Sequence, residues 1–82
     1  MFWTYALQSE SSGRYYIGST SDLKRRLQEH NGNLAAASKN RGPWRLVYEE
    51  AYATRGEAMK RERYLKTGKG REELKRQTEP SR

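Results

Sequence analysis

Two runs of β-favouring residues, joined by a short turn, set the architecture of the first quarter of this chain. Phe2–Gln8 is rich in aromatic and β-favouring side chains, and Tyr15–Gly18 is a second, shorter run of the same kind. The intervening segment, Ser9–Gly13, consists of turn-forming residues. A five-residue connection of this composition is typical of antiparallel neighbours. The segment therefore predicts a β-hairpin.

Helix and strand patterns alternate after the hairpin. Ser19 and Asp22 have the spacing of a helix-capping box, so a helix is expected from about Ser21 to His30. The Asn-Gly pair at positions 31 and 32 provides its left-handed stop. Trp44–Tyr52 is expected to be a third strand, and apolar residues on both of its faces predict a central position in the sheet.

The C-terminal third is expected to be helical. Thr54 and Glu57 form a second capping box, and the helix that follows should reach about Lys66. Gly68–Gly70 is expected to interrupt the chain before a short basic helix over Arg71–Gln77.

A length of 82 residues fits a single domain with a small core. We expect residues 1–77 to form an α+β domain, in which helices flank a three-stranded antiparallel sheet in the order ββαβα(α). Residues 78–82 are expected to be a flexible tail.

Composition narrows the classes of function. The formal net charge of +7 favours a polyanionic partner, most commonly nucleic acid; the alternative is a basic soluble protein without such a partner. The absence of cysteine and the single histidine exclude disulfides, thiolate sites and multi-histidine zinc sites. The chain has no membrane-length apolar run and no signal-peptide pattern, so we expect a cytoplasmic protein that does not associate with membranes.

Two polar residues fall on a helix face that should be apolar. Counting from Leu23, the positions on one face include Arg26 and His30. Burying an unpaired guanidinium is costly. The pair indicates either a functional site or an arginine at the edge of the apolar stripe beside a hydrogen-bonded histidine.

Glu62 raises the same question in the next helix, because it falls between Ala58 and Leu65 on the apolar face, away from Lys60, Arg61 and Arg63. A structural explanation is an ion pair with a core arginine such as Arg26. A functional explanation is a carboxylate that holds Mg²⁺, or Mn²⁺, together with water and substrate phosphate. The chain lacks clustered carboxylates, so a single ion is expected.

Tyr5 and Tyr16 are predicted to lie on neighbouring strands with converging hydroxyl groups. Each could instead be a core residue whose hydroxyl binds a backbone group. Gly18 would allow close approach of a backbone or a phosphate.

Taken in order, these residues resemble the motifs of the GIY-YIG nuclease superfamily, especially its small stand-alone bacterial members. The resemblance is carried by Tyr5–Ser9, Tyr15–Leu27, His30–Asn31, Glu62–Lys66 and Gly68–Arg71. It implies a metal-dependent endonuclease with one active site per chain. It also implies that DNA is the substrate, with RNA as the alternative. The implied catalytic residues are Tyr5, Tyr16, Arg26, His30 and Glu62, and the implied metal ligand is Glu62.

The chain departs from the family pattern at three places. Trp3-Thr4 stands where the first motif has Gly-Ile. The segment 37–40 has neither the tyrosine nor the histidine of many family nucleases, so Ser38 or Lys39 would have to substitute. The late asparagine of several relatives has no counterpart. These departures concern catalysis more than fold.

Basic residues are expected to contact the nucleic-acid backbone without reading bases. The residues assigned to binding are Gly18, Lys39, Arg41, Arg45, Lys66, Lys69 and Arg71. Specificity would come from substrate shape, a homodimer or an accessory protein. The rival predictions are a non-catalytic nucleic-acid-binding module with a degenerate site, and a protein-interaction domain that exposes Trp3 or Trp44.

Overall fold

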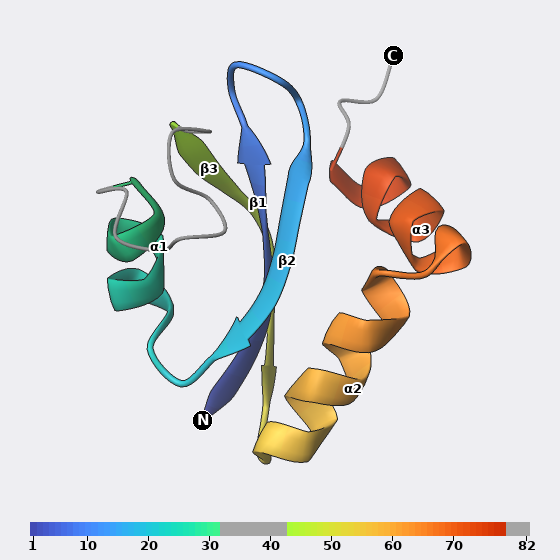
Figure 1. The fold of residues 1–82 in the computed structure, drawn as a ribbon. Helices are drawn as coiled ribbons and strands as arrows, with labels where there is room; N and C mark the ends of the chain where they lie inside the picture. The colour runs from blue at the N-terminus through green and yellow to red at the C-terminus, as the bar shows by residue number, and fades with distance from the viewer. Residues whose placement is uncertain (32–42, 79–82) are drawn as a thin grey trace.

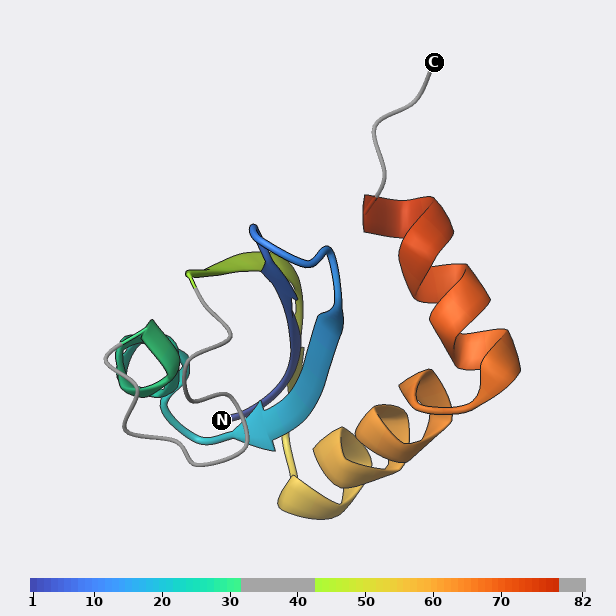
Figure 2. The same cartoon turned by 45° about the horizontal axis from the view of Figure 1, so that its top comes forward.

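The predicted order of elements is confirmed by the computed structural model, which describes residues 1–31 and 43–78. The elements are β1 (Phe2–Ser9), β2 (Tyr15–Thr20), α1 (Leu23–Asn31), β3 (Trp44–Tyr52), α2 (Arg55–Leu65) and α3 (Gly68–Thr78). The three strands form one antiparallel sheet in the order β2-β1-β3. Helix α1 covers one face, and α2 and α3 cover the other (Figure 1). In Figure 2 the strands bend toward α1.

Strand β1, rather than β3, is the central strand, so the predicted central position of β3 is wrong. The apolar residues of β3 face both sides because helices cover both faces of the sheet. Leu46 packs into the cluster beneath α1, whereas Val47 and Tyr48 pack into the cluster beneath α2 and α3. A register shift makes this possible: Ala6 pairs with Tyr48 and Leu7 with Leu46, which leaves Val47 as the extra residue of a β-bulge.

The sheet separates two small apolar clusters. The first, beneath α2 and α3, contains Ala6, Ile17, Leu65 and Leu74. The second, beneath α1, contains Tyr5, Leu7 and Trp44. Burial of Trp44 removes it as a source of the exposed patch that a protein-interaction domain would need.

Side-chain caps start the first two helices. The Asp22 carboxylate accepts a hydrogen bond from the Arg25 backbone N–H at 3.1 Å, so α1 begins at Leu23, two residues later than expected. The Thr54 hydroxyl accepts from the Glu57 N–H at 3.3 Å and bonds the Glu57 carboxylate at 2.9 Å. The Thr54–Glu57 capping box is confirmed. At the first helix Asp22 is itself the cap, so the expected box between Ser19 and Asp22 is not formed, and the Ser19 hydroxyl donates to Glu62 instead.

Gly68–Gly70 does not interrupt the helices, contrary to expectation, but forms the first turn of α3. The break lies just before it, where the Thr67 hydroxyl accepts from the Gly70 N–H at 3.1 Å. A Cβ on Gly70 would overlap the carbonyl oxygen of Tyr64. Glycine is therefore needed here for close packing between α2 and α3, and not as a helix breaker.

Helix α3 extends through Thr78, whose hydroxyl lies 2.7 Å from the hydroxyl of Tyr15. The sequence placed Thr78 in the tail; the rest of that segment, 79–82, lies outside the described residues. Among the described helices, none has the length and apolar character that crossing a bilayer requires.

Candidate active site

The Tyr5 hydroxyl is the centre of a buried polar group beneath α1. Tyr5 is 1% exposed and His30 is completely buried. The Tyr5 hydroxyl lies 3.3 Å from His30 Nε2, and it accepts a hydrogen bond from Arg26 Nε at 3.3 Å. The prediction that Arg26 and His30 share the sheet-facing side of α1 is confirmed.

The direction of these hydrogen bonds follows from the charges of the groups. A guanidinium N–H can only donate, so the Tyr5 oxygen accepts from Arg26 and can donate its own proton to His30. Burial raises the pKa of Tyr5, against an opposing effect of Arg26. Burial, reinforced by the positive charge of Arg26, lowers the pKa of His30. At neutral pH the tyrosine therefore keeps its proton and the imidazole is neutral, which fits a Tyr5 O–H donor and a His30 acceptor.

Tyr16 meets the same group through ring contacts. Its ring centroid lies 4.5 Å from that of His30 and 6.2 Å from that of Trp44. The hydrogen bonds that Arg26 donates to Tyr5 and to Glu29 raise the pKa of Arg26, and the Tyr16 hydroxyl adds to this effect. Tyr16 thus lies beside both His30 and Arg26.

The two tyrosines lie on neighbouring strands, as predicted, and they are diagonal neighbours in the register. Tyr5 pairs with Gly18, and Tyr16 pairs with Leu7. A Cβ on Gly18 would lie 2.7 Å from the Tyr5 hydroxyl oxygen and 2.9 Å from its Cζ. The Tyr5 ring therefore packs against Gly18. The expected role of Gly18 as a contact for nucleic acid is wrong, because the buried phenol fills the space above it.

Glu62 reaches the site from the opposite face of the sheet. Its carboxylate accepts a hydrogen bond from the Ser19 hydroxyl at 2.8 Å and forms an ion pair with Lys66 Nζ at 2.7 Å. The structural alternative of a Glu62–Arg26 pair is not observed, because Arg26 pairs with Glu29 at 2.9 Å. Ser19 and Glu29 were not predicted as part of the site. Alternation along β2 could have indicated Ser19, since it points away from the face that Gly18 occupies.

An open hollow over the outer edge of β2 joins the two sides of the site. Its volume is about 280 Å³, and both Tyr16 and Glu62 line it. Because β2 is an edge strand, side chains from both faces can meet over it. The Glu62 carboxylate is also near enough to contribute to the raised pKa of Tyr5, after burial and other causes. The five predicted residues therefore gather around β2.

The Glu62 carboxylate can hold one hard divalent cation, provided that Lys66 first moves away from it. Within the described residues, no three histidine, aspartate or glutamate side chains are arranged to hold a metal ion. Glu62 is the one carboxylate that lines the hollow, and its side chain is 20% exposed. Mg²⁺ and Mn²⁺ accept such a site when water and substrate phosphate complete the coordination. Lys66 would first have to leave the carboxylate.

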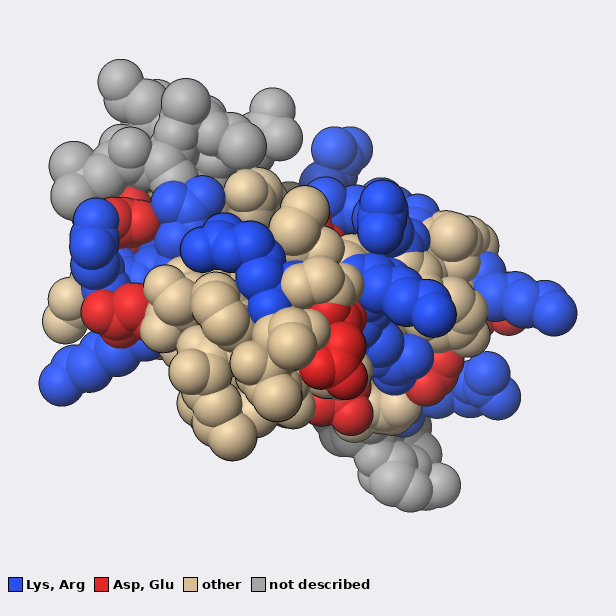
Figure 3. All heavy atoms as spheres, turned by 90° about the horizontal axis from the view of Figure 1, so that it is seen from below, with Lys and Arg blue, Asp and Glu red and all other residues tan. Residues whose placement is uncertain are grey.

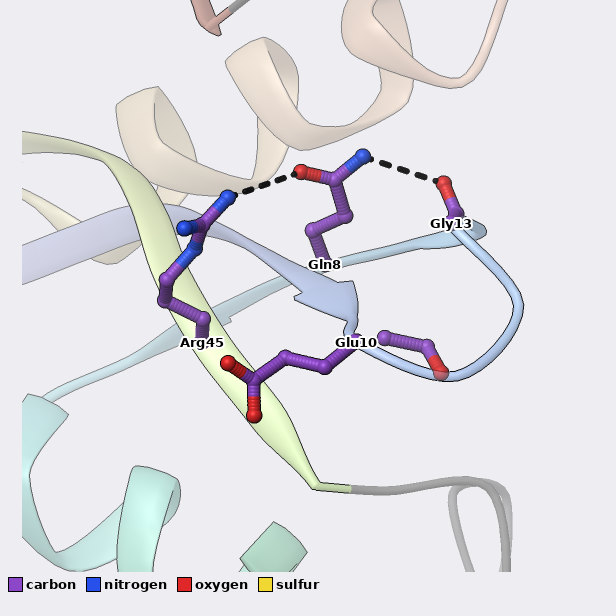
Figure 4. A pocket seen from close by; sticks show the side chains of 5 residues that line it. Gln8, Glu10, Gly13 and Arg45 are labelled. Carbon is purple, nitrogen blue, oxygen red and sulfur yellow. Dashed lines mark hydrogen bonds between the residues drawn. The ribbon is translucent and has the colours of Figure 1, made fainter.

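The residues assigned to backbone binding have different positions. Arg71 lines the hollow together with Lys66, and Lys69 is exposed on α3. Arg45 lies at the hairpin end of the sheet, where it donates to the Gln8 side chain at 3.4 Å (Figure 4). The remaining two assignments, Lys39 and Arg41, lie outside the described residues, as does Ser38.

Arg61 was expected to point away from the sheet, and this is wrong. It donates to the Tyr48 hydroxyl at 3.3 Å and pairs with Glu73 at 2.9 Å and with Glu50 at 3.5 Å. This cluster links β3, α2 and α3 on the side of the sheet away from α1. The hydroxyl of Tyr48 and the carboxylates allow the guanidinium to be half-buried there.

The fold and the site together define a small α+β domain with a polar site built around an edge strand. The family model described as the GIY-YIG catalytic domain matches residues 1–76, and the chain belongs to this family. GIY-YIG domains form a family of nucleases, which act on nucleic acid and generally depend on divalent metal ions.

The chain is similar to small stand-alone bacterial members of the family. It is 45% identical over 58 residues to UPF0213 proteins of Staphylococcus aureus strains Mu3 and COL, covering 70% of this chain and 71% of each relative. It also resembles the solution NMR structure of a UPF0213 protein from Bacillus halodurans. That match has 35% identity and a TM-score of 0.54, and it covers 90% of this chain and 82% of the other.

Proposed function

We propose that this protein is an endonuclease that hydrolyses phosphodiester bonds in DNA, with one active site per chain and one Mg²⁺ or Mn²⁺ ion. The observation that carries the proposal is that a hydrogen-bonded polar group and an open hollow lie next to each other around β2. Arg26, Tyr5 and His30 form one hydrogen-bonded group. Beside it, Tyr16 and Glu62 line a common hollow. A guanidinium can neutralise phosphate charge, a phenol can orient a water and a carboxylate can hold one metal ion, which are the roles that phosphodiester hydrolysis needs.

Arg26 would stabilise charge on the scissile phosphate. Its side chain is 35% exposed, and its planar fork matches the non-bridging oxygens. Tyr5 and Glu29 each hold one of its nitrogens, which fixes the orientation of the guanidinium before substrate arrives. His30 holds Tyr5 in turn.

Tyr16 is the better candidate for contact with the attacking water. Tyr5 is 1% exposed, whereas Tyr16 is half-buried and lines the hollow with Glu62. Tyr16 would orient the attacking water in the hollow, and it lies beside Arg26 and His30. Glu62 would hold the divalent ion, which supplies charge neutralisation at the phosphate and at the leaving 3′ oxygen.

Exposed cations would hold the strand without reading its bases. Arg71 lines the hollow, Lys69 is exposed on the same helix, and Lys66 would join them once freed from Glu62. Specificity would then depend on substrate shape, on a homodimer or on an accessory protein. We place the reaction in the cytoplasm.

One observation favours a second candidate, a nucleic-acid-binding module that does not cut. The Lys66 ammonium lies 2.7 Å from the carboxylate that would hold the metal ion. If this pair persists in the presence of Mg²⁺ and DNA, the site would bind strands without hydrolysing them. Metal dependence separates the two functions, because phosphate contacts alone need no Mg²⁺.

The test is a cleavage panel of single-stranded, duplex, flapped and branched DNA with Mg²⁺, with Mn²⁺ and with EDTA. Glu62→Gln keeps the shape of the side chain and the hydrogen bond from Ser19 to the amide oxygen. We expect it to abolish metal-dependent cleavage and to leave DNA binding in EDTA nearly unchanged. Absence of cleavage by the wild-type protein on every substrate would favour the binding module.

A further inference from the structure

A second hollow adjoins the proposed active site at the end of the sheet where β2 leads into α1. It has a volume of about 320 Å³. We call it the arginine groove, and its lining residues are Ser19–Asp22, Arg25, Arg26, Glu29 and Arg55. Figure 3 views the protein from this end, with Lys and Arg side chains on the α1 side and across the α2 and α3 side, and acidic side chains between them.

The charges of the groove are unevenly matched. Glu29 accepts from Arg25 at 3.2 Å and from Arg26 at 2.9 Å, so one carboxylate is shared by two guanidinium groups. Asp22 is engaged as the cap of α1. Arg55 forms no ion pair with any other residue in the described part of the chain. The groove therefore contains a guanidinium with uncompensated charge.

Arg55 is held in an orientation that suits a ligand. Its Cζ lies 5.1 Å from the centroid of the Phe2 ring, a cation–π distance that fixes the side chain at modest entropic cost. Arg55 is also the first residue of α2, where the helix dipole disfavours a positive charge. Helix stability thus gives no reason for an arginine at this position, whereas an anionic ligand in the groove does.

Two residues connect the groove to the proposed active site. Arg26 lines the groove and donates to Tyr5. Ser19 lines the groove and donates to Glu62. A strand whose scissile phosphate lies beside Arg26 and Glu62 would therefore continue into the groove.

We propose that the arginine groove binds a phosphate of the nucleic-acid strand next to the scissile phosphate, with Arg55 as its principal contact. The position relative to the cut rests on the proposed function, whereas the phosphate site itself does not. A planar guanidinium donates two parallel hydrogen bonds to phosphate oxygens. The exposed Ser21 hydroxyl at the rim is a further donor.

The test measures phosphate contacts without cleavage. A short fluorescent DNA duplex is titrated with protein in EDTA over a series of salt concentrations, and the slope of log K against log salt gives the number of contacts. Arg55→Gln should reduce the magnitude of this slope by about one and weaken binding of every sequence equally. Arg14→Gln is the matched control: Arg14 is an exposed arginine in the β1–β2 turn, so the charge change is the same, and the slope should not change.

A second measurement locates the contact. Addition of the same duplex to ¹⁵N-labelled wild-type protein should shift the Arg55 side-chain Nε–H signal and the backbone amides of Thr20 and Ser21. Loss of a positive charge from the first turn of α2 should not unfold the variant, and its circular dichroism should match the wild type. Arg55→Lys keeps the charge without the fork and should restore only part of the affinity.

Equal slopes for Arg55→Gln, Arg14→Gln and wild type would overturn the proposal, as would an Arg55 signal unaffected by DNA. Both measurements are made in EDTA, so they remain valid for a protein that never cuts. Lost contact in Arg55→Gln without any cleavage by wild type would support the groove and refute the endonuclease. Cleavage by wild type together with equal slopes would support the endonuclease and refute the phosphate site in the groove.

Discussion

The Tyr5 ring lies directly over Gly18 on the neighbouring strand, and the space that a side chain at Gly18 would need is taken by the phenol. This contact fixes where the Tyr5 hydroxyl meets Arg26 and His30. Gly18 on β2 thus acts through packing: it positions the Tyr5 ring on the neighbouring strand β1, and through it the polar group beneath α1.

Gly18→Ala is expected to displace the Tyr5 ring. A methyl group 2.7 Å from the hydroxyl oxygen is over-packed, which typically costs about 1–3 kcal/mol. Urea unfolding should show this loss, and DNA cleavage should fall sharply. Gly56→Ala is the control, because a Cβ there has nothing within 4 Å and alanine favours the helix by about 0.5–1 kcal/mol. Equal stability of the two variants would contradict the packing role.

Tyr5→Phe and Tyr16→Phe should have different effects. Removal of the Tyr5 hydroxyl leaves Arg26 Nε and His30 Nε2 without this partner in a buried region, with a loss of roughly 1–3 kcal/mol in unfolding free energy. Removal of the hydroxyl from half-buried Tyr16 should lower kcat by about 10²-fold or more with little loss of stability. Denaturation and single-turnover cleavage, measured on the same preparations, would separate the two roles. A larger loss of stability in Tyr16→Phe and a larger loss of kcat in Tyr5→Phe would exchange the roles of the two tyrosines.

Stability should fall as the pH drops below about 6.5. The pKa of His30 is lowered from its ordinary 6.5 by burial and by Arg26, so the unfolded chain binds the proton more tightly. The stabilising contribution is present above pH 6.5 and is lost as the pH falls through the folded-state pKa. Thermal unfolding between pH 7.5 and about 5.5, where carboxylates with ordinary pKa values near 4.5 stay mostly ionised, should show this slope, and His30→Gln should remove it. An unchanged slope in His30→Gln would assign the effect to another group.

Lys66→Met should tighten metal binding in the absence of DNA. The Lys66 ammonium forms an ion pair with the Glu62 carboxylate, and a metal cation must displace the ammonium before it can bind. Loss of this competitor is expected to increase Mn²⁺ affinity by about tenfold, or 1.4 kcal/mol, as measured by electron paramagnetic resonance of free Mn²⁺. Lys69→Met has the same charge change on an exposed position of α3 and should leave the affinity unchanged. Weaker Mn²⁺ binding in Lys66→Met would contradict competition at Glu62.

Local patterns predicted much of the fold because the interactions behind them are close in sequence. The Asp22 and Thr54 caps bond backbone groups within three residues, and the bounds of β3 follow its own apolar run. The role of Gly68–Gly70 was not predictable from local propensity, because the carbonyl oxygen of Tyr64 decides it through packing between helices. The central position of β1 was not predicted for a similar reason. Helices cover both faces of the sheet, so the edge strand β3 has apolar residues on both faces, as a central strand would.

The sequence alone determined which side chains belong together, because helical spacing places Arg26 and His30 on one face of α1 whatever the rest of the chain does. Only the tertiary structure decided how they meet the others. Pairing of Tyr5 with Gly18 sets the depth of the phenol, and the edge position of β2 lets Glu62 reach the site from the opposite face. These relationships join residues from β1, β2, α1 and α2, and no local pattern encodes a distance between elements that pack only when the whole sheet has formed.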